Sequence, residues 1–126
     1  MYIKKIVEYV FNYAEYIVTD GTNDVRCICM SVPLPNGLEP KVGMEITKIY
    51  IFTINELEIK LAKNKKEVIK HRLGLSYKII GKVIARNIIE CLGYKFTFYE
   101  DTIGFEIGDY VEVIADRLDC IVENYY

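Results

Sequence analysis

The sequence predicts a mainly β fold with one short helix. The chain of 126 residues holds 11 Tyr and 5 Phe among many Ile and Val. Such side chains suit the pleated, half-buried surface of a sheet. Hydrophobic residues make up 52% of the chain and charged residues 27%, which is ordinary for a globular protein. A chain of this length fits a single domain over residues 1–126.

A second observation behind this prediction is an internal repeat. The run Val42-Gly43-Met44-Glu45-Ile46 returns as Ile103-Gly104-Phe105-Glu106-Ile107, displaced by 61 positions, and the likeness continues through the strand pattern that follows each run. Self-similarity of this kind indicates two copies of one β unit packed together. The sequence therefore predicts pseudo-repeats over residues 5–60 and 77–123.

The first element, residues 3–19, has two interpretations. Ile3, Ile6 and Val10 fall at helical spacing with charged residues between them. The density of Ile, Val and Tyr instead favours a long strand that ends in a hairpin turn at Asp20-Gly21. Because a second β run over residues 24–32 follows at once, we expect strand, and the helical alternative for residues 3–11 stays open.

The next segment, residues 33–40, holds every proline of the chain and is predicted to be a loop, because proline lacks the N–H that a sheet ladder needs. Leu34 and Leu38 are apolar residues on this loop. We expect them either to cap the open end of a barrel or to dock into a partner.

Strand patterns return after the loop. Residues 44–54 are apolar on both strand faces, as in a strand that is covered on two sides. Asn64 is a candidate N-cap for a short basic helix over about residues 64–73, with Gly74 just past its end. Further β runs are predicted after this helix, at residues 77–92, 94–99, 110–115 and 118–123.

This element order resembles that of an OB-type barrel, in which three strands precede a helix and further strands. The turn Thr19-Asp20-Gly21 also resembles the turn that many OB folds have between their first two strands. The resemblance covers residues 3–99 and includes no diagnostic motif. Because the strands after residue 100 exceed a five-stranded barrel, the sequence predicts either a small OB-like barrel or two intertwined β half-barrels from the internal repeat.

Charge is distributed unevenly along the chain. Residues 60–86 carry seven Lys and two Arg against Glu67, a net charge of +8, whereas residues 87–126 carry two basic and nine acidic residues, a net charge of −7. Phosphates attract Lys and Arg, so one interpretation is a face that binds a polyanion. The other is that the two segments neutralise each other within the fold or across a dimer. The candidate ligand-binding residues are Lys65, Lys66, Lys70, Arg72, Lys82 and Arg86.

Catalytic motifs are missing from the sequence. Neither of its two serines lies in a G-x-S-x-G motif, and no glycine-rich phosphate loop is present. His71, the only histidine, lies between Lys70 and Arg72 and is expected to be exposed on the predicted helix. These observations favour a protein that is not an enzyme and has no cofactor.

The four cysteines lack the spacing of a zinc site. Cys27 and Cys29 would share one face of a strand, but Cys91 and Cys120 lie too far apart to form the second C-x(2–4)-C pair. We therefore expect reduced thiols that pack as small hydrophobic side chains, and no metal.

Charged residues interrupt the N-terminal apolar run, so no secretory signal is expected, and no window is long and apolar enough for a membrane span. The predicted location is the cytoplasm. The sequence favours a non-enzymatic small β-barrel module that binds a protein partner or itself. The alternative is an OB-like protein that binds single-stranded nucleic acid through residues 60–86.

Overall fold

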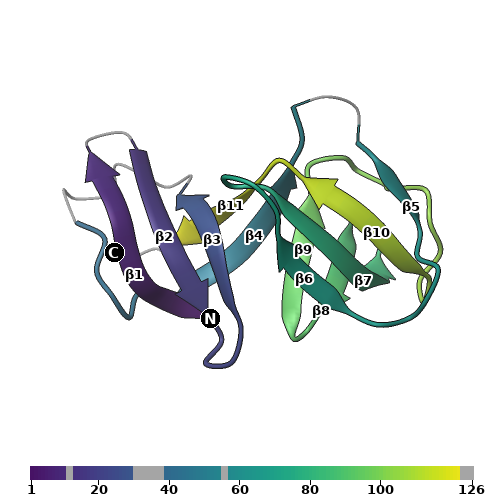
Figure 1. Ribbon diagram of the computed structural model, residues 1–126, viewed down its shortest axis with the longest axis horizontal. Helices are drawn as coiled ribbons and strands as arrows, with labels where there is room; N and C mark the ends of the chain where they lie inside the picture. Colours follow the sequence, from purple (N-terminus) through teal and green to yellow (C-terminus); the bar gives the residue numbers. More distant parts are fainter. Residues whose placement is uncertain (11–12, 30–38, 55–56, 123–126) are drawn as a thin grey trace. The chain divides into compact units, whose positions relative to one another are not determined.

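The computed structural model describes residues 1–10, 13–29, 39–54 and 57–122, and there its regular structure is entirely β (Figure 1). The strands in chain order are β1 (Tyr2–Val10), β2 (Tyr13–Thr19), β3 (Asp24–Cys29), β4 (Ile46–Phe52), β5 (Ile59–Leu61), β6 (Val68–His71), β7 (Tyr77–Ala85), β8 (Ile88–Cys91), β9 (Tyr94–Phe98), β10 (Tyr110–Ala115) and β11 (Arg117–Val122). The prediction of a β fold is confirmed.

The strands join in one sheet with the order β1-β2-β3-β11-β4-β9-β8-β7-β10-β5, and β6 pairs with β7 beside this path. β11 runs parallel to β3, whereas pairs such as β1 with β2 and β7 with β10 are antiparallel. In the described part of the chain β1 and β5, the two end strands, do not pair with each other. The sheet is therefore not closed into a barrel, and the predicted OB-like barrel is not confirmed.

The chain divides into two compact units. Unit 1 comprises Met1–Ile49 and Asp119–Tyr126, and unit 2 comprises Tyr50–Leu118. β4 and β11 each begin in one unit and end in the other, because the boundaries fall inside these strands. Each predicted pseudo-repeat, residues 5–60 and 77–123, therefore contains parts of both units. The single domain over residues 1–126 stays a prediction.

Unit 1 is built on the hairpin of β1 and β2. The two strands pair from Tyr2 with Thr19 to Val10 with Tyr13, so residues 3–10 are strand and the helical alternative is wrong for them. The predicted single long strand is also wrong, because the chain reverses between β1 and β2. Ile3 and Tyr16 are fully buried in the core of this unit.

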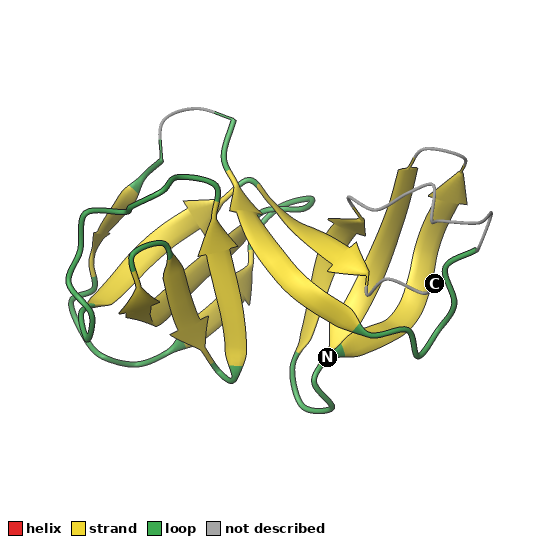
Figure 2. Ribbon diagram, turned by 180° about the vertical axis from the view of Figure 1, so that it is seen from behind, coloured by secondary structure: helices red, strands yellow, loops and turns green. Residues whose placement is uncertain are grey.

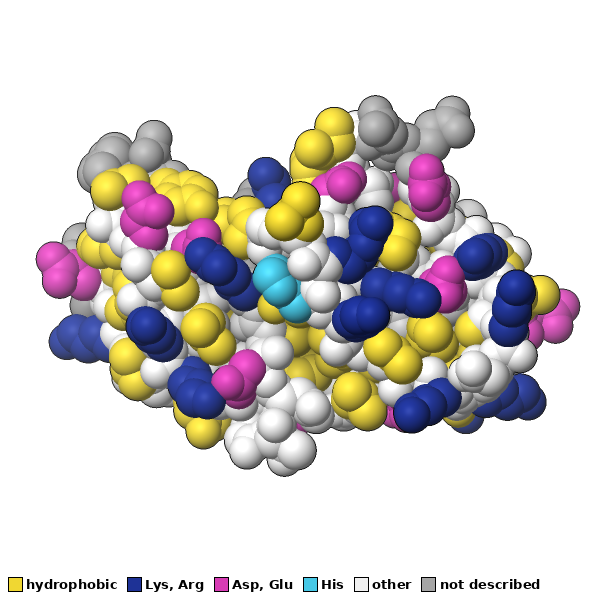
Figure 3. Space-filling view, viewed as in Figure 1, with side chains coloured by type: hydrophobic (Ala, Val, Ile, Leu, Met, Phe, Trp, Pro, Cys, Tyr) yellow, Lys and Arg dark blue, Asp and Glu magenta, His cyan; other side chains and the backbone are white. Residues whose placement is uncertain are grey.

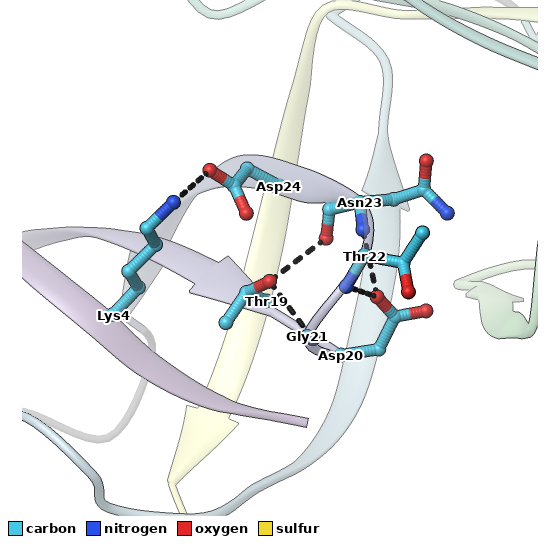
Figure 4. Close-up of polar contacts among 7 residues, drawn as sticks. All are labelled: Lys4, Thr19, Asp20, Gly21, Thr22, Asn23 and Asp24. Carbon is cyan, nitrogen blue, oxygen red and sulfur yellow. Dashed lines mark hydrogen bonds and ion pairs between the residues drawn. The ribbon is translucent and has the colours of Figure 1, made fainter.

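The predicted turn at Asp20-Gly21 is confirmed, and it joins β2 to β3 (Figure 4). One Asp20 carboxylate oxygen accepts the backbone N–H of Thr22 at 2.9 Å and that of Asn23 at 2.8 Å. These hydrogen bonds lower the pKa of the Asp20 carboxyl. Gly21 has a φ of 98°, a conformation that glycine adopts without a steric cost. The Asx geometry and the glycine together explain why this turn could be predicted.

β7 is the central strand of unit 2. β10 pairs along one edge of β7, while β6 and β8 pair with different parts of the other edge. Tyr77, Ile79 and Val83 are buried on one side of the strand. On the other side Lys82 is exposed and Lys78 is half-buried, but Ile80 between them is buried. This arrangement gives unit 2 an apolar core and an outward face that is rich in lysine.

The predicted basic helix over about residues 64–73 is wrong. Val68 to His71 form β6, which pairs with β7 so that Val68 lies opposite Ile80. Asn64 accepts the Lys66 N–H at 3.1 Å, but in a turn and not at the start of a helix. β-Branched residues and the long-range ladder to β7 outweigh the local helix signals. Figure 2 shows strands and loops, and no helix, in the described residues.

The two windows of the predicted repeat do not correspond position by position. Ile49 and Ile51 of β4 are buried, but their counterparts at the offset of 61, Tyr110 and Glu112 of β10, are only half-buried. Ile107 lies in a turn before β10 and is 73% exposed. Side chains alternate along a strand. The positions that face the interior in β4 therefore correspond, at the offset of 61, to positions that face outward in β10.

Candidate functional site

Strand register gathers lysines on the outward face of unit 2. Lys70 of β6 lies opposite Lys78 of β7, and Glu112 of β10 lies between Ile80 of β7 and Lys60 of β5. Lys82 follows two positions beyond Ile80 on the same side of β7. We call this surface the lysine face and define it by Lys60, Lys70, Lys78, Lys82 and Glu112.

Glu112 lies at the centre of the lysine face and pairs with two of its lysines. Its carboxylate oxygens lie 3.2 Å from Lys60 Nζ and 3.2 Å from Lys78 Nζ. Partial burial raises the pKa of the Glu112 carboxyl, but the hydrogen bonds and positive charge of the two lysines outweigh this effect and lower the pKa overall. Glu112 is therefore an ionised carboxylate at neutral pH.

A groove opens beside Glu112. It has a volume of about 360 Å³, and it is lined by Lys60, Lys63, Asn64, Lys78, Ile80 and Glu112. A smaller hollow of about 210 Å³ shares Lys60 and Glu112 with it. The hydrogen bond from the Lys66 N–H to Asn64 Oδ1 orders the turn that carries Lys63 and Asn64. The groove thus combines three ammonium groups, one amide and one carboxylate.

The structure brings only some of the predicted site residues together. Lys70 and Lys82 lie on the lysine face itself. Lys65 and Lys66 are exposed in the connection from β5 to β6. Arg72 extends the hairpin of β6 and β7, since its N–H donates to the Ser76 carbonyl at 2.9 Å.

The remaining predicted site residues lie elsewhere. Arg86 is exposed in the turn that joins β7 to β8. Leu34 and Leu38 lie outside the described residues. Sequence reasoning did not select Lys60, Lys78 or Glu112 as site residues. Lys78 and Lys82 fall on the same side of a strand, which is a signal for a basic strand face. The pairing of Lys78 with Lys70 was missed, because a helix was predicted where β6 lies.

Little of the positive charge in residues 60–86 is neutralised by ion pairs. Within the described part of the chain, Lys60 and Lys78 are the members of this segment that form salt bridges, and both share Glu112. Figure 3 shows many Lys and Arg side chains, and few acidic ones, over the half of the view where β5, β7 and β10 lie. The lysine face therefore keeps a net positive charge.

Aromatic side chains cluster on a different part of unit 2. The rings of Tyr50 and Tyr99 stack with centroids 4.8 Å apart, and the Arg117 guanidinium lies 3.9 Å from the centroid of Phe52. Tyr50 and Phe52 belong to β4, Tyr99 directly follows β9, and Arg117 starts β11. The Phe52 carbonyl accepts the Asp116 N–H at 2.9 Å just beyond β10. On the lysine face the neighbouring aromatic residue is Tyr110, opposite Lys82 and half-buried.

The histidine is exposed, and the four cysteines are buried. His71 is exposed at the end of β6, where a ring nitrogen lies 2.5 Å from the Gly74 carbonyl oxygen. All four cysteines are buried thiols, and burial raises the pKa of Cys91 to about 12, which keeps it protonated and unreactive. No group of three or more His, Cys, Asp and Glu side chains in the described ranges could hold a metal ion.

Comparison with models of protein families, with curated proteins and with solved structures finds no match to this chain. In the ranges that the structure describes, no helix has the length and apolar character to cross a membrane.

Proposed function

We propose that this chain is a non-enzymatic binding module, and that the lysine face of unit 2 binds an acidic segment of a protein partner. The observation that supports this proposal is the register of β5, β6, β7 and β10, which places four lysines on one sheet surface around a single carboxylate. A partner that supplies further carboxylates complements the charge that Glu112 leaves unbalanced.

The expected binding is electrostatic and sensitive to salt. An exposed pair of Lys and carboxylate contributes about 0.2–1 kcal/mol, so four such pairs give a weak complex unless apolar contacts add to it. Ile114 lies among the lysines on the same face and is half-buried, so it supplies some apolar surface, whereas Ile80 is only 9% exposed. A positive surface of this kind also increases the rate of encounter with an acidic partner.

Single-stranded nucleic acid is the second candidate, and the stacked Tyr50 and Tyr99 rings with Arg117 nearby are the observation in its favour. Proteins of this class combine a basic groove with aromatic side chains on which successive bases stack. The aromatic residue opposite Lys82 on the lysine face itself is Tyr110, which is half-buried. The lysine face itself therefore suits a peptide better than a chain of bases.

An OB-like closure of unit 1 is our proposal for the other half of the chain. An antiparallel bridge joins Tyr2 of β1 to Glu45, and the Ile3 N–H donates to the Met44 carbonyl at 2.9 Å. These contacts bring the start of β1 next to the residues that precede β4. In the sheet order β1 and β4 are separated by β2, β3 and β11, so this bridge supports a ring of five strands.

Binding of a fluorescent peptide rich in Asp and Glu tests the proposed function. Fluorescence anisotropy of the wild-type protein at 50 mM and 300 mM salt should show binding that weakens as salt rises. The double variant Lys70→Gln and Lys82→Gln should bind more weakly. The matched control, Lys5→Gln with Lys41→Gln, removes two exposed lysines from unit 1 and should bind as the wild type does.

Two results would contradict the proposed function. One is an absence of peptide binding at low salt, and the other is an equal loss of affinity in the two double variants. Tighter binding of an unstructured oligonucleotide than of the acidic peptide would favour the second candidate. Size-exclusion chromatography of the protein alone tests the remaining expectation, that the module binds itself.

A further inference from the structure

We propose that the groove beside Glu112 binds the phosphoryl group of a phosphorylated residue in the acidic partner; this inference rests on the proposed function. The groove is the place where the lysine face becomes concave. Its three lysines and one glutamate sum to a charge of +2 (three positive minus one negative). A phosphomonoester carries about −1.5 to −2 at neutral pH, so it balances this charge.

A carboxylate neutralises the positive charge of the groove less completely than a phosphoryl group does. A single Asp or Glu side chain supplies one negative charge and leaves the groove at about half of its positive charge. A phosphoryl group also offers three acceptor oxygens. The groove has matching donors on separate elements: Lys60 on β5, Lys63 in the following turn and Lys78 on β7. Charge-assisted hydrogen bonds from such donors are roughly twice as strong as neutral ones.

Asn64 adds an uncharged donor to the groove. Its Oδ1 accepts the Lys66 N–H, so the other end of the amide, Nδ2, has both of its N–H groups available within the described residues. Lys63 and Asn64 lie next to each other in a turn that this hydrogen bond orders. The hydrogen bond holds the Asn64 amide in place, so this donor loses less conformational freedom when an anion binds.

Glu112 forms ion pairs with two lysines of the groove while no phosphoryl group is bound. Its carboxylate lies 3.2 Å from both Lys60 and Lys78, which are two of the three ammonium groups of the groove. An incoming anion must share these lysines with Glu112. The carboxylate thereby disfavours singly charged ligands, which gain too little from Lys63 to displace it, and selects for a dianion.

A phosphorylated peptide fits these observations better than a nucleic-acid terminus. The aromatic residue on the lysine face, Tyr110, is half-buried, so a base beside a bound terminal phosphate would lack an exposed ring on which to stack. Ile114, which is half-buried at the smaller hollow beside Glu112, offers an aliphatic contact to a peptide side chain. The occupant we infer is a phosphoserine or phosphothreonine within an acidic segment.

The test compares three labelled peptides of one acidic sequence, with a central Ser, phosphoserine, or a Glu-Glu pair that matches the phosphoserine charge. The wild type should bind the phosphoserine peptide about tenfold more tightly than the Ser peptide, a difference of roughly 1.4 kcal/mol. It should bind the Glu-Glu peptide with an intermediate affinity. The gain from phosphorylation should shrink between pH 7.5 and 5.5, as the phosphoryl dianion takes up one proton and becomes a monoanion.

A pair of matched lysine variants tests whether the gain in affinity on phosphorylation comes from the groove. Lys63→Gln removes an ammonium group from the groove, and Lys70→Gln removes one from the lysine face outside the groove. Lys63→Gln should abolish most of the phosphoserine gain, whereas Lys70→Gln should weaken all three peptides and keep their ratio. Glu112→Gln should strengthen binding of all three peptides and reduce the discrimination between them. Thermal unfolding of each variant checks that the fold is retained.

The outcomes separate this inference from the proposed function. If the Ser peptide binds but phosphorylation adds nothing, or if Lys63→Gln keeps the full gain, the groove is not a phosphoryl site and the proposed function stands. If no acidic peptide binds, the proposed function fails and the inference fails with it. If a 5′-phosphorylated oligonucleotide binds more tightly than the phosphopeptide, the assignment to a protein partner is wrong.

Discussion

Replacement of Gly81 by alanine tests how closely β7 and β8 approach in unit 2. An alanine Cβ at this position would lie 2.7 Å from the Glu90 carbonyl oxygen and 3.2 Å from Cys91 Cβ. The first distance is roughly 0.5 Å or more below an ordinary non-bonded contact. The oxygen belongs to the backbone of β8, so no side-chain rotation relieves the clash, and β8 must move away from β7.

The displacement of β8 has a second consequence in the same region. The Cys91 thiol lies 3.4 Å from the Val68 carbonyl oxygen at the start of β6, so a shift of β8 also disturbs β6. Overpacking a well-packed core costs about 1–3 kcal/mol. We expect Gly81→Ala to lower the free energy of unfolding by this amount.

Urea unfolding followed by far-UV circular dichroism measures the effect. The midpoint of the variant should fall while the slope stays unchanged, as expected for a change in stability alone. Lys82→Ala is the neighbouring control, because Lys82 is exposed, and it should change stability by less than about 0.5 kcal/mol. A Gly81→Ala protein as stable as the wild type would show that the close approach of β7 and β8 is not present.

Three further predictions concern buried groups and the β2–β3 turn. Tyr16→Phe should leave the free energy of unfolding within about 1 kcal/mol of the wild type, because the neighbour of the buried hydroxyl is the Cys29 thiol, a weak hydrogen-bonding group; a larger loss of stability would contradict this. Asp20→Ala should destabilise by about 1 kcal/mol or less, since the carboxylate is exposed. The lowered pKa of Asp20 means that this contribution is present above the normal carboxyl pKa and is lost as the pH falls through the lowered value; a stability difference between variant and wild type that is unchanged down to pH 2 would refute it. The four cysteines should resist iodoacetamide in the native protein at pH 8 and react after unfolding, as mass spectrometry can show, and rapid labelling of native Cys91 would contradict its burial.

The strands were predictable where local signals and burial agree. Alternating apolar residues marked β10 at residues 110–115, and Asp20-Gly21 marked the turn after β2 because both residues have the chemistry of a tight turn. The break between β7 and β8 was missed, since the sequence from Tyr77 to Leu92 holds no proline and its one glycine, Gly81, lies inside β7. The reversal between β1 and β2 likewise has no glycine to signal it.

The helix failed as a prediction because a long-range interaction decides that segment. Asn64 and Gly74 have the chemistry of helix caps, but both serve turns here. Val68 and Ile69 gain a ladder with β7 that no local pattern reveals. Pairing across the chain contributes packing that a surface helix with a narrow apolar stripe cannot supply.

The candidate site was predictable in its charge and not in its geometry. The excess of Lys and Arg in residues 60–86 identified the segment that forms the lysine face. The role of Glu112 depends on the register of β10 with β7 and β5, which places one acidic residue between two lysines distant in sequence. One interpretation of the sequence was a face that binds a polyanion, and the other was neutralisation of the basic segment by the acidic one. Neither predicted that a single carboxylate would lie among the lysines.

A titration of the isotopically labelled protein with the acidic peptide, followed by backbone amide chemical shifts, tests the central claim most directly. We expect the largest shifts on β5, β6, β7 and β10 and on the turn with Lys63, while the amides of β1 and β2 stay unchanged. Shifts confined to unit 1, or to the cluster of Tyr50 and Tyr99, would contradict the claim that the lysine face is the binding surface.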